Sequence, residues 1–134
     1  MREEKSCGAI IINEKKVLVI KQNDGTIGFP KGHMEIGETE VDTAIRETKE
    51  ETNLDIVINA EKRYEMSYII ERKKVLKKVV LYLAYATNPN AILKQDNELE
   101  YAKWIDIDKV LDILNYDDTK MLWQKVYNEI TDCR

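Results

Sequence analysis

A chain of 134 residues, 43% of them hydrophobic and 34% charged, has the size and composition of one globular domain with its own core. Its net charge of −4 and pI near 5.2 argue against a general binder of nucleic-acid backbones, because such proteins carry a basic face. No apolar run is long enough to span a bilayer, and the polar start of the chain does not resemble a secretory signal. We therefore expect a single domain over residues 1–134, cytoplasmic, monomeric or homodimeric, with no membrane partner.

The two cysteines, Cys7 and Cys133, lie at opposite ends of the chain, without the close spacing of metal-binding cysteines. We expect both to be reduced thiols, as is usual in the cytosol, with a disulfide between the ends as the alternative.

Two apolar runs open the chain, Cys7–Ile12 and Val17–Gln22, with a polar turn at Asn13–Lys16 between them. This pattern predicts a hairpin, and the nearly continuous apolarity predicts strands that are covered on both faces. Asn23–Thr26 is then a turn. The Gly-Phe-Pro-Lys-Gly-His segment that follows is interpreted as a loop, in which Gly32 lets the backbone approach a ligand closely.

The next segment predicts a helix from about Glu40 to Thr52. Thr39 is a natural N-cap with Asp42 three residues later, and Asn53 tolerates the left-handed conformation that ends many helices. The side of the helix expected to lie on a sheet is a mostly apolar stripe formed by Val41, Ala44, Ile45 and Thr48.

The other side of this helix is strongly acidic. Seven acids and two bases lie between Gly32 and Asn53, a local charge of −5, so the rest of the chain is close to neutral. Glu47, Glu50 and Glu51 fall within one quarter of the helix circumference, although like charges at these spacings oppose a helix by roughly 0.2–0.5 kcal/mol per pair. Clustered oxygen ligands suit a hard divalent cation, Mg²⁺ first, which also binds substrate phosphates. A solvated acidic face is the alternative.

Three further residues are expected beside these acids. Arg46 is placed to hold Glu38 in a bidentate pair that ties the loop to the helix. Lys31 is a cation next to carboxylates, which suits a phosphorylated ligand. His33 is the only histidine, and two interpretations of it remain open: a loop residue with a satisfied ring, or a phosphate contact.

The remaining chain predicts alternating strands and helices. The expected elements are a strand at Leu54–Asn59, a hairpin of Arg63–Ile70 and Val75–Ala86, a strand at Tyr101–Ile105, and helices at Ile107–Leu114 and Thr119–Thr131. In the last helix Leu122, Val126 and Ile130 recur every four residues, which indicates a face that docks on the sheet.

The second hairpin is the most aromatic region, with Tyr64, Tyr68, Tyr82 and Tyr85. Each tyrosine alone is more often a strand-packing residue than a ligand contact. Together with Lys77 and Lys78, tyrosines near a phosphate site would stack a base and hold its phosphates.

The spacing of the charged residues closely resembles the Nudix box, the signature of the Nudix hydrolase family. The matching positions are Gly32, Glu38, Arg46, Glu47, Glu50, Glu51 and Leu54. Two positions differ from the family pattern: Thr48 stands where an aliphatic residue is usual, and Asn53 replaces the terminal glycine. Neither change removes a charged group of the motif.

The resemblance implies a fold and a chemistry. The fold is an α/β/α sandwich, a mixed sheet between helices, with the motif forming a loop–helix–loop. The chemistry is hydrolysis of a nucleoside diphosphate linked to another group, with Mg²⁺ bound, or Mn²⁺ as a substitute. By the same resemblance Glu47, Glu50 and Glu51 bind the metal, with the Gly32 carbonyl, while Glu38 and Arg46 brace the structure.

A narrower resemblance concerns the substrate. The residues Phe29–His33, Lys77–Val80, Glu98 and Trp104 are similar to the branch of the family that hydrolyses diadenosine tetraphosphate to ATP and AMP. In that branch a glutamate in the region of Glu98 assists the metal or acts as the base. Polyphosphate and adenine are held by lysines and tyrosines, which here implies Lys31, Lys77 and Tyr82, with His33 as a further candidate.

Two alternatives remain open at this stage. One is another Nudix reaction, on damaged nucleoside triphosphates, diphosphoinositol polyphosphates or the 5′ pyrophosphate of RNA. The other is a catalytically silent Nudix module that binds a nucleotide as a regulator. The retained acidic residues argue against the second alternative, since such modules are expected to lose them.

Overall fold

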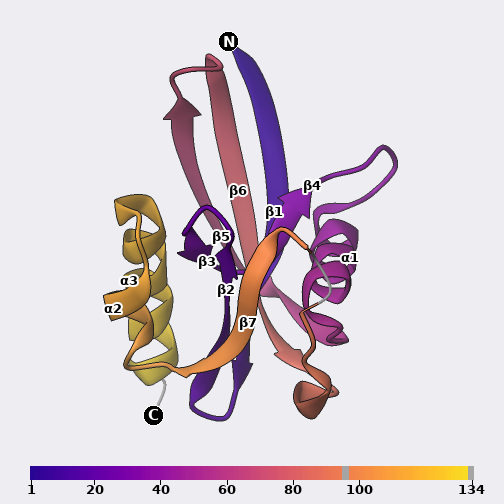
Figure 1. Ribbon diagram of the computed structural model, residues 1–134, viewed down its shortest axis with the longest axis vertical. Coiled ribbons are helices and arrows are strands. Elements are labelled where there is room, and N and C mark those ends of the chain that lie inside the picture. The colour runs from indigo at the N-terminus through magenta and orange to yellow at the C-terminus, as the bar shows by residue number, and fades with distance from the viewer. Residues whose placement is uncertain (95–96, 133–134) are drawn as a thin grey trace.

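The computed structural model describes residues 1–94 and 97–132 and contains a mixed, seven-stranded sheet (Figure 1). The strands are β1 (Arg2–Asn13), β2 (Lys16–Gln22), β3 (Ile27–Gly28), β4 (Lys31–His33), β5 (Ile56–Ile70), β6 (Val75–Ala86) and β7 (Leu99–Asp106). The helices are α1 (Glu40–Thr52), α2 (Val110–Ile113) and α3 (Asp117–Asp132), with a short 3₁₀ turn at Pro89–Ala91. In the part of the chain described, none of the helices is long and apolar enough to cross a membrane.

Helices lie on both sides of the sheet, with α1 on one side and α2 and α3 on the other (Figure 1). Alternate residues of the central strands point to the two sides, so apolar residues pack on both faces of the sheet. The core next to α3 contains Ile10, Val19, Leu81, Trp123 and Val126. On the α1 side, Val41 packs against Cys7, Val80 and Tyr82. The α/β/α sandwich is therefore confirmed.

Strand β1 is the centre of the sheet. The predicted hairpin with β2 is confirmed, with Ile12 opposite Val17, but β1 pairs over most of its length with β6 in parallel, from Arg2 to Ile11. The strand order is β3-β2-β1-β6-β5, with β4 added to β1 and β7 to β2. Because both faces of β1 are covered, residues 6–11 are all buried, as its continuous apolarity predicted.

The structure corrects the prediction for the second hairpin. The strand predicted at Leu54–Asn59 and the first strand of the hairpin form one long strand, β5. Its pairing with β6 shifts register between Asn59, opposite Leu83, and Arg63, opposite Tyr82. Three residues of β5 therefore bulge out, and the interruption that the sequence showed at residues 60–62 is a bulge rather than a loop.

Two smaller predictions are also corrected. The segment interpreted as a loop before the acidic helix contains the short strands β3 and β4, because pairing with β2 and β1 satisfies its backbone groups. The predicted helix Ile107–Leu114 is shortened to α2, because the Lys109 N–H donates to the Asp106 carbonyl in a turn that precedes the helix.

Helix α1 agrees closely with its predicted ends. Thr39 accepts from the Asp42 N–H and Asp42 accepts from the Thr39 N–H, a complete capping box, and Asn53 ends the helix at φ 69°. Of the predicted packing stripe, Ala44 and Thr48 are fully buried, but Ile45 is 39% exposed. Ile45 lies about 100° around the helix from Ala44, which turns it away from the sheet.

Thr48 is buried with an unsatisfied hydroxyl. In the described part of the chain its Oγ1 has no hydrogen-bond partner. A buried polar group without a partner costs about 1–3 kcal/mol, and valine has nearly the same shape. We therefore expect Thr48→Val to raise the free energy of unfolding by about 1 kcal/mol, measured by urea denaturation. Thr131→Val is the control, since the Thr131 hydroxyl donates to the Tyr127 carbonyl at 2.7 Å and its loss gives no stabilisation. A destabilised Thr48→Val would contradict this account.

Cys7 is a free thiol in the core below α1. Burial, the largest cause, and the nearby Glu40 carboxylate together raise the pKa of this thiol to about 11. The thiol therefore stays protonated near neutral pH. Cys133, the other cysteine considered in the sequence analysis, lies outside the described residues.

Candidate active site

Strand β4 lies against the acidic side of α1. The Lys31 N–H donates to Glu51 Oε1 at 3.0 Å, and Glu51 is only 6% exposed. The Glu47 carboxylate lies against the Cα of Gly32, where the Cβ of any other residue would be. Glycine at position 32 is therefore required for the close approach of the strand to the helix.

Arg46 connects the loop before α1 with the acids on the helix. Its guanidinium donates from Nε and Nη2 to the two oxygens of Glu38, at 2.6 and 3.0 Å, so the predicted bidentate pair is present. Further bonds reach the His33 carbonyl at 2.9 Å, Glu47 at 2.9 Å and Glu50 at 3.3 Å. The pKa of Glu38 is lowered to about 2, and the largest cause is its hydrogen bonding with Arg46. One cation thus fixes the loop, strand β4 and helix α1 relative to one another.

The oxygen donors near Gly32 match those that a hard divalent cation prefers. The carboxylates of Glu47, Glu50 and Glu51 lie on one side of α1, and Glu47 is in contact with the backbone of Gly32. Within residues 1–94 and 97–132, no group of three His, Cys, Asp or Glu side chains is arranged to hold a metal ion. Glu47 and Glu50 are instead hydrogen-bonded to Arg46. The donor set fits a divalent cation in kind.

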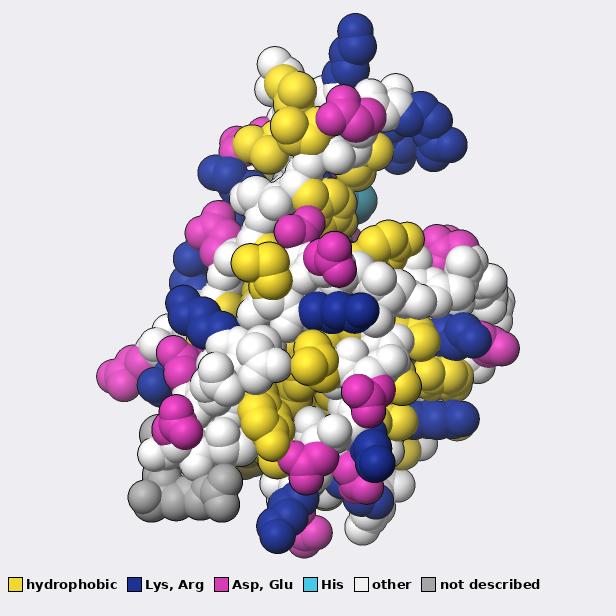
Figure 2. Space-filling model, turned by 90° about the vertical axis from the view of Figure 1, so that its left-hand side faces the viewer, with side chains coloured by type: hydrophobic (Ala, Val, Ile, Leu, Met, Phe, Trp, Pro, Cys, Tyr) yellow, Lys and Arg dark blue, Asp and Glu magenta, His cyan; other side chains and the backbone are white. Residues whose placement is uncertain are grey.

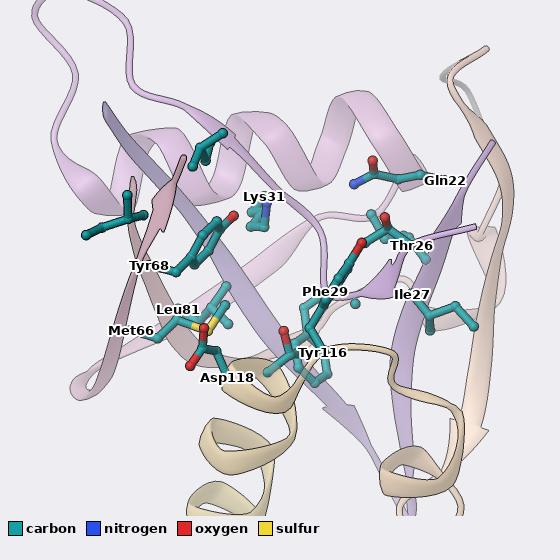
Figure 3. Close-up of a pocket in the computed structure, with 15 residues that line it drawn as sticks. Gln22, Thr26, Ile27, Phe29, Lys31, Met66, Tyr68, Leu81, Tyr116 and Asp118 are labelled. Carbon is teal, nitrogen blue, oxygen red and sulfur yellow. The ribbon is translucent and has the colours of Figure 1, made fainter. Parts of the chain in front are cut away.

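A cavity of about 420 Å³ opens beside Lys31. It is lined by Ile20, Gln22, Thr26, Ile27, Gly28, Phe29, Lys31, Met66, Tyr68, Ile69, Ile70, Leu81, Tyr116, Asp118 and Thr119. Figure 3 shows Lys31 and Tyr68 in one part of the cavity, below helix α1 in this view. The floor is apolar, whereas Gln22, Thr26 and Asp118 supply polar groups. The cavity therefore suits a flat apolar group that carries a few polar atoms, such as a nucleobase.

Lys31 belongs both to the cavity and to the acidic site. Its side chain lines the cavity, while its backbone binds Glu51. Burial lowers the pKa of its ammonium group, and the charges of Glu51 and Glu47 oppose this shift. An anionic group at the boundary between cavity and acids would meet this ammonium group, as the sequence analysis expected of Lys31.

Two further nitrogen-bearing side chains, His33 on β4 and Lys77 on β6, lie close together. Lys77 is 7% exposed, and its Nζ lies 2.8 Å from His33 Nε2. Burial lowers the pKa of both side chains, and for His33 the charge of Lys77 adds to this shift. This contact favours a neutral His33 ring, whose Nε2 accepts a hydrogen bond from the Lys77 ammonium group.

The basic character continues toward the turn between β5 and β6. That turn carries Arg72, Lys73 and Lys74, and Lys73 acts electrostatically on both His33 and Lys77. Figure 2 shows Lys and Arg side chains gathered at the end of the molecule where this turn and the N-terminus lie. A line of cations thus extends away from the acids of α1.

The tyrosines of the second hairpin separate into different environments. Tyr68 lines the cavity, whereas the buried Tyr64 donates to Glu129 on α3 and Tyr85 is 56% exposed. Tyr82, which the sequence analysis selected as a substrate contact, is not among the cavity residues: it is 6% exposed and donates to Glu40 at 2.8 Å on the α1 side. In β6 the side chains alternate between the two sides, so Leu81 rather than Tyr82 reaches the cavity.

Tyr116 is a cavity residue that the sequence reasoning missed. It lies between α2 and α3 and is 58% exposed. The neighbouring Asn115 accepts from the Ile27 N–H at 2.5 Å, which fixes this connection beside β3. Tyr116 and Asn115 precede the last helix outside any apolar periodicity, so only the tertiary contact reveals their position.

Glu98 lies just before β7 with its side chain exposed. Its carbonyl accepts from the Asn23 N–H at 2.9 Å, and Leu99 pairs with Gln22, a cavity residue. This puts the backbone at Glu98 near the edge of the cavity. Its suggested part in metal assistance or proton transfer stays a prediction.

Known proteins are similar to this chain in sequence and in fold. Residues 3–124 match the family model of the NUDIX domain. The asymmetrical bis(5′-nucleosyl)-tetraphosphatase of Mus musculus is 27% identical, with 90% of this chain and 91% of that protein covered, and the Caenorhabditis elegans enzyme of the same name is 33% identical over 72% and 70%. A crystal structure of a C. elegans Ap4A hydrolase binary complex superposes with a TM-score of 0.83 at 27% identity, covering 96% of this chain and 98% of that one. The chain thus belongs to the Nudix family and is a Nudix hydrolase.

Proposed function

We propose that this enzyme hydrolyses diadenosine tetraphosphate (Ap4A) to ATP and AMP. The observation that carries the proposal is the 420 Å³ cavity, lined in part by Phe29, Tyr68 and Tyr116, that meets the acids of α1 at Lys31. A nucleoside in the cavity would direct its phosphates past Lys31 toward α1. The relatives named as tetraphosphatases and Ap4A hydrolases support the same substrate.

The acids of α1 are assigned to metal binding. Nudix hydrolases generally use a divalent metal, and here we assign Mg²⁺, with Mn²⁺ as a substitute, to Glu47, Glu50 and Glu51 with the Gly32 carbonyl. When bound, such an ion polarises the phosphoryl oxygens and lowers the pKa of a coordinated water. Arg46 and Glu38 keep the loop and β4 in place beside these acids. Either Glu98 or an acid of α1 accepts the proton of the attacking water.

The basic residues are assigned to the polyphosphate. Lys31, at the boundary of the cavity, binds the phosphate next to the nucleoside in the cavity. Lys77 binds phosphates further along the chain, since it belongs to the line of cations that leaves the site, and the neutral His33 ring beside it adds a hydrogen-bonding group. The tetraphosphate of Ap4A is longer than the triphosphate of a nucleoside triphosphate or of RNA, and it makes use of both positions.

Tyr68 and Tyr116 replace Tyr82 as the proposed base contacts, since both line the cavity. A stacked base contributes about 1–3 kcal/mol per aromatic side chain. We therefore expect Tyr68→Leu to raise KM for Ap4A about tenfold, with little change in kcat. Tyr85→Leu, on the same hairpin but exposed away from the cavity, is the control and is expected to leave KM unchanged. Equal KM values for wild type and Tyr68→Leu in steady-state kinetics would exclude Tyr68 as a base contact.

The proposed reaction is tested by product analysis in ¹⁸O-labelled water with Mg²⁺. The panel contains Ap4A, an oxidised nucleoside triphosphate, a diphosphoinositol polyphosphate and a 5′-triphosphorylated RNA. We expect the highest kcat/KM for Ap4A, with ¹⁸O in only one of the two products, ATP or AMP. Preferential turnover of another member of the panel would replace the proposed substrate. Tight binding of Ap4A without turnover of any compound would instead indicate a nucleotide sensor.

A further inference from the structure

The first residue of α1, Glu40, is not one of the matching positions of the Nudix box, and it lies at the centre of a charged network whose other members are outside the motif. Its carboxylate accepts from Arg63 Nε and Nη2 at 2.9 and 3.0 Å and from the Tyr82 hydroxyl at 2.8 Å, and it forms an ion pair with Lys5. These partners come from β5, β6 and β1, so one side chain joins the start of α1 to three strands. Hydrogen bonds from Arg63, the largest cause, lower the pKa of Glu40 well below its usual value.

The bulge in β5 brings Arg63 to this position. Without the register shift, the residue of β5 opposite Tyr82 would be Ala60, the next after Asn59. The three extra residues put Arg63 there instead, on the side of the sheet that α1 covers. A bulge interrupts the pairing of a strand and re-aims a side chain, so its presence at this point is an independent sign that Arg63 has a positional role.

Glu40 and the acids assigned to the metal lie on the same side of the helix. Seven residues separate Glu40 from Glu47 and eleven separate it from Glu51, and at about 100° per residue both return to within about 20° of Glu40. The helix is bound to the sheet through Glu40 at its first turn and to the Lys31 N–H through Glu51 at its last. Rotation of the helix about its axis would break both attachments.

We infer that Glu40 and Arg63, with Tyr82 and Lys5, form a clamp that sets the rotation of α1 and so aims Glu47 and Glu51 at the bound metal. Glu40 and Arg63 are positioning residues in this inference, which rests on the metal-binding role proposed for α1. The helix start is already stabilised by its capping box, which uses Thr39 and Asp42 alone. The attachment to three strands is therefore not needed to cap the helix, and it instead fixes the direction in which the side chains of the helix point.

The test measures metal affinity as well as turnover. Mn²⁺ binding is followed by electron paramagnetic resonance of the free ion, and kcat and KM are measured with Ap4A. For Glu40→Gln and Arg63→Met we expect the Kd for Mn²⁺ to rise about tenfold and kcat to fall about 10- to 100-fold, with KM within about twofold, as for residues that orient metal ligands. Arg63→Lys retains the charge without the two-point contact and is expected to restore only part of the affinity.

Two controls separate orientation from stability. Glu65→Gln removes the other carboxylate bound to Arg63, at 3.2 Å, but leaves Glu40 in place, so metal affinity should equal that of the wild type. Val126→Ala creates a cavity in the core under α3 and lowers the melting temperature without altering the Kd for Mn²⁺. Tyr82→Phe, which removes one hydroxyl, is expected to give a smaller rise in the Kd for Mn²⁺. This variant tests the clamp if Glu40→Gln does not fold.

The outcomes also separate this inference from the proposed function. Wild-type Mn²⁺ affinity in both Glu40→Gln and Tyr82→Phe would overturn the clamp while leaving the function intact. The clamp is also excluded if Val126→Ala raises the Kd as much as Glu40→Gln does. A wild-type enzyme that neither binds Mn²⁺ nor hydrolyses Ap4A would instead overturn the proposed function.

Discussion

Glu51→Gln is expected to lower kcat for Ap4A by at least about 100-fold while leaving the fold intact. Glu51 is the most buried acid of the α1 cluster and faces the Lys31–Gly32 backbone, where the proposed metal would lie. The amide oxygen of glutamine can still accept the hydrogen bond from the Lys31 N–H, so the helix stays attached to β4. What is lost is the negative charge, and removing one fixed electrostatic interaction of an active site costs about 10²–10³ in rate.

Steady-state kinetics over a range of Mg²⁺ concentrations, with melting temperatures alongside, check this expectation. Glu47→Gln and Glu50→Gln are expected to weaken turnover strongly as well. Glu100→Gln is the matched control, because the exposed Glu100 carboxylate pairs with Lys21 and is not one of the acids of α1, so its loss should change nothing. A near-wild-type rate for Glu51→Gln at saturating Mg²⁺ would show that the metal is held elsewhere.

Helix α1 was predictable because its signals are local. The capping box of Thr39, the left-handed Asn53 and the pair of Arg46 with Glu38 are all encoded within a few turns of chain, and each is present in the structure. The same holds for α3, whose buried Leu122 and Val126 follow the helical period. Such features depend on residues less than ten positions apart, so the sequence order determines which groups meet.

The parts that sequence reasoning missed depend on pairing between distant strands. Nothing local indicates that β1 pairs in parallel with β6, or that a bulge puts Arg63 opposite Tyr82. That register decides which side of the sheet each tyrosine of β6 and β5 faces. A single-residue shift would exchange the sides that Leu81 and Tyr82 face, so the sequence alone could not tell that Leu81, and not Tyr82, lines the cavity.

The two sides of the sheet divide the proposed work between them. The cavity proposed to receive the nucleoside lies on the side of α3, with Tyr116 just before that helix, while the acids lie on α1 across the sheet. Strand β4 lies where the two meet, because Lys31 lines the cavity and Gly32 touches Glu47. In the proposed function the Lys31–Gly32 pair joins substrate recognition to the reaction, and the sequence singled out both residues without showing that they connect the two sites.

Arg46→Lys is expected to lower kcat/KM for Ap4A by about 10- to 100-fold although the positive charge is kept. A lysine ammonium cannot reproduce the planar fork that bonds both oxygens of Glu38 and the His33 carbonyl together. The loop and β4 then lose their shared attachment to α1, and Gly32 is no longer held against Glu47.

The acid dependence of stability tests the same arrangement without any substrate. Because the folded-state pKa of Glu38 is about 2, below its ordinary 4.5, this residue contributes stability that is complete above pH 4.5 and is lost as the pH falls toward 2. Arg46 is the largest cause of that shift, so Arg46→Lys should melt at a lower temperature than wild type at pH 6. The difference should shrink steadily as the pH approaches 2. A melting-temperature difference that is the same at pH 6 and pH 2.5 would mean that Glu38 is not the partner through which Arg46 holds the site together.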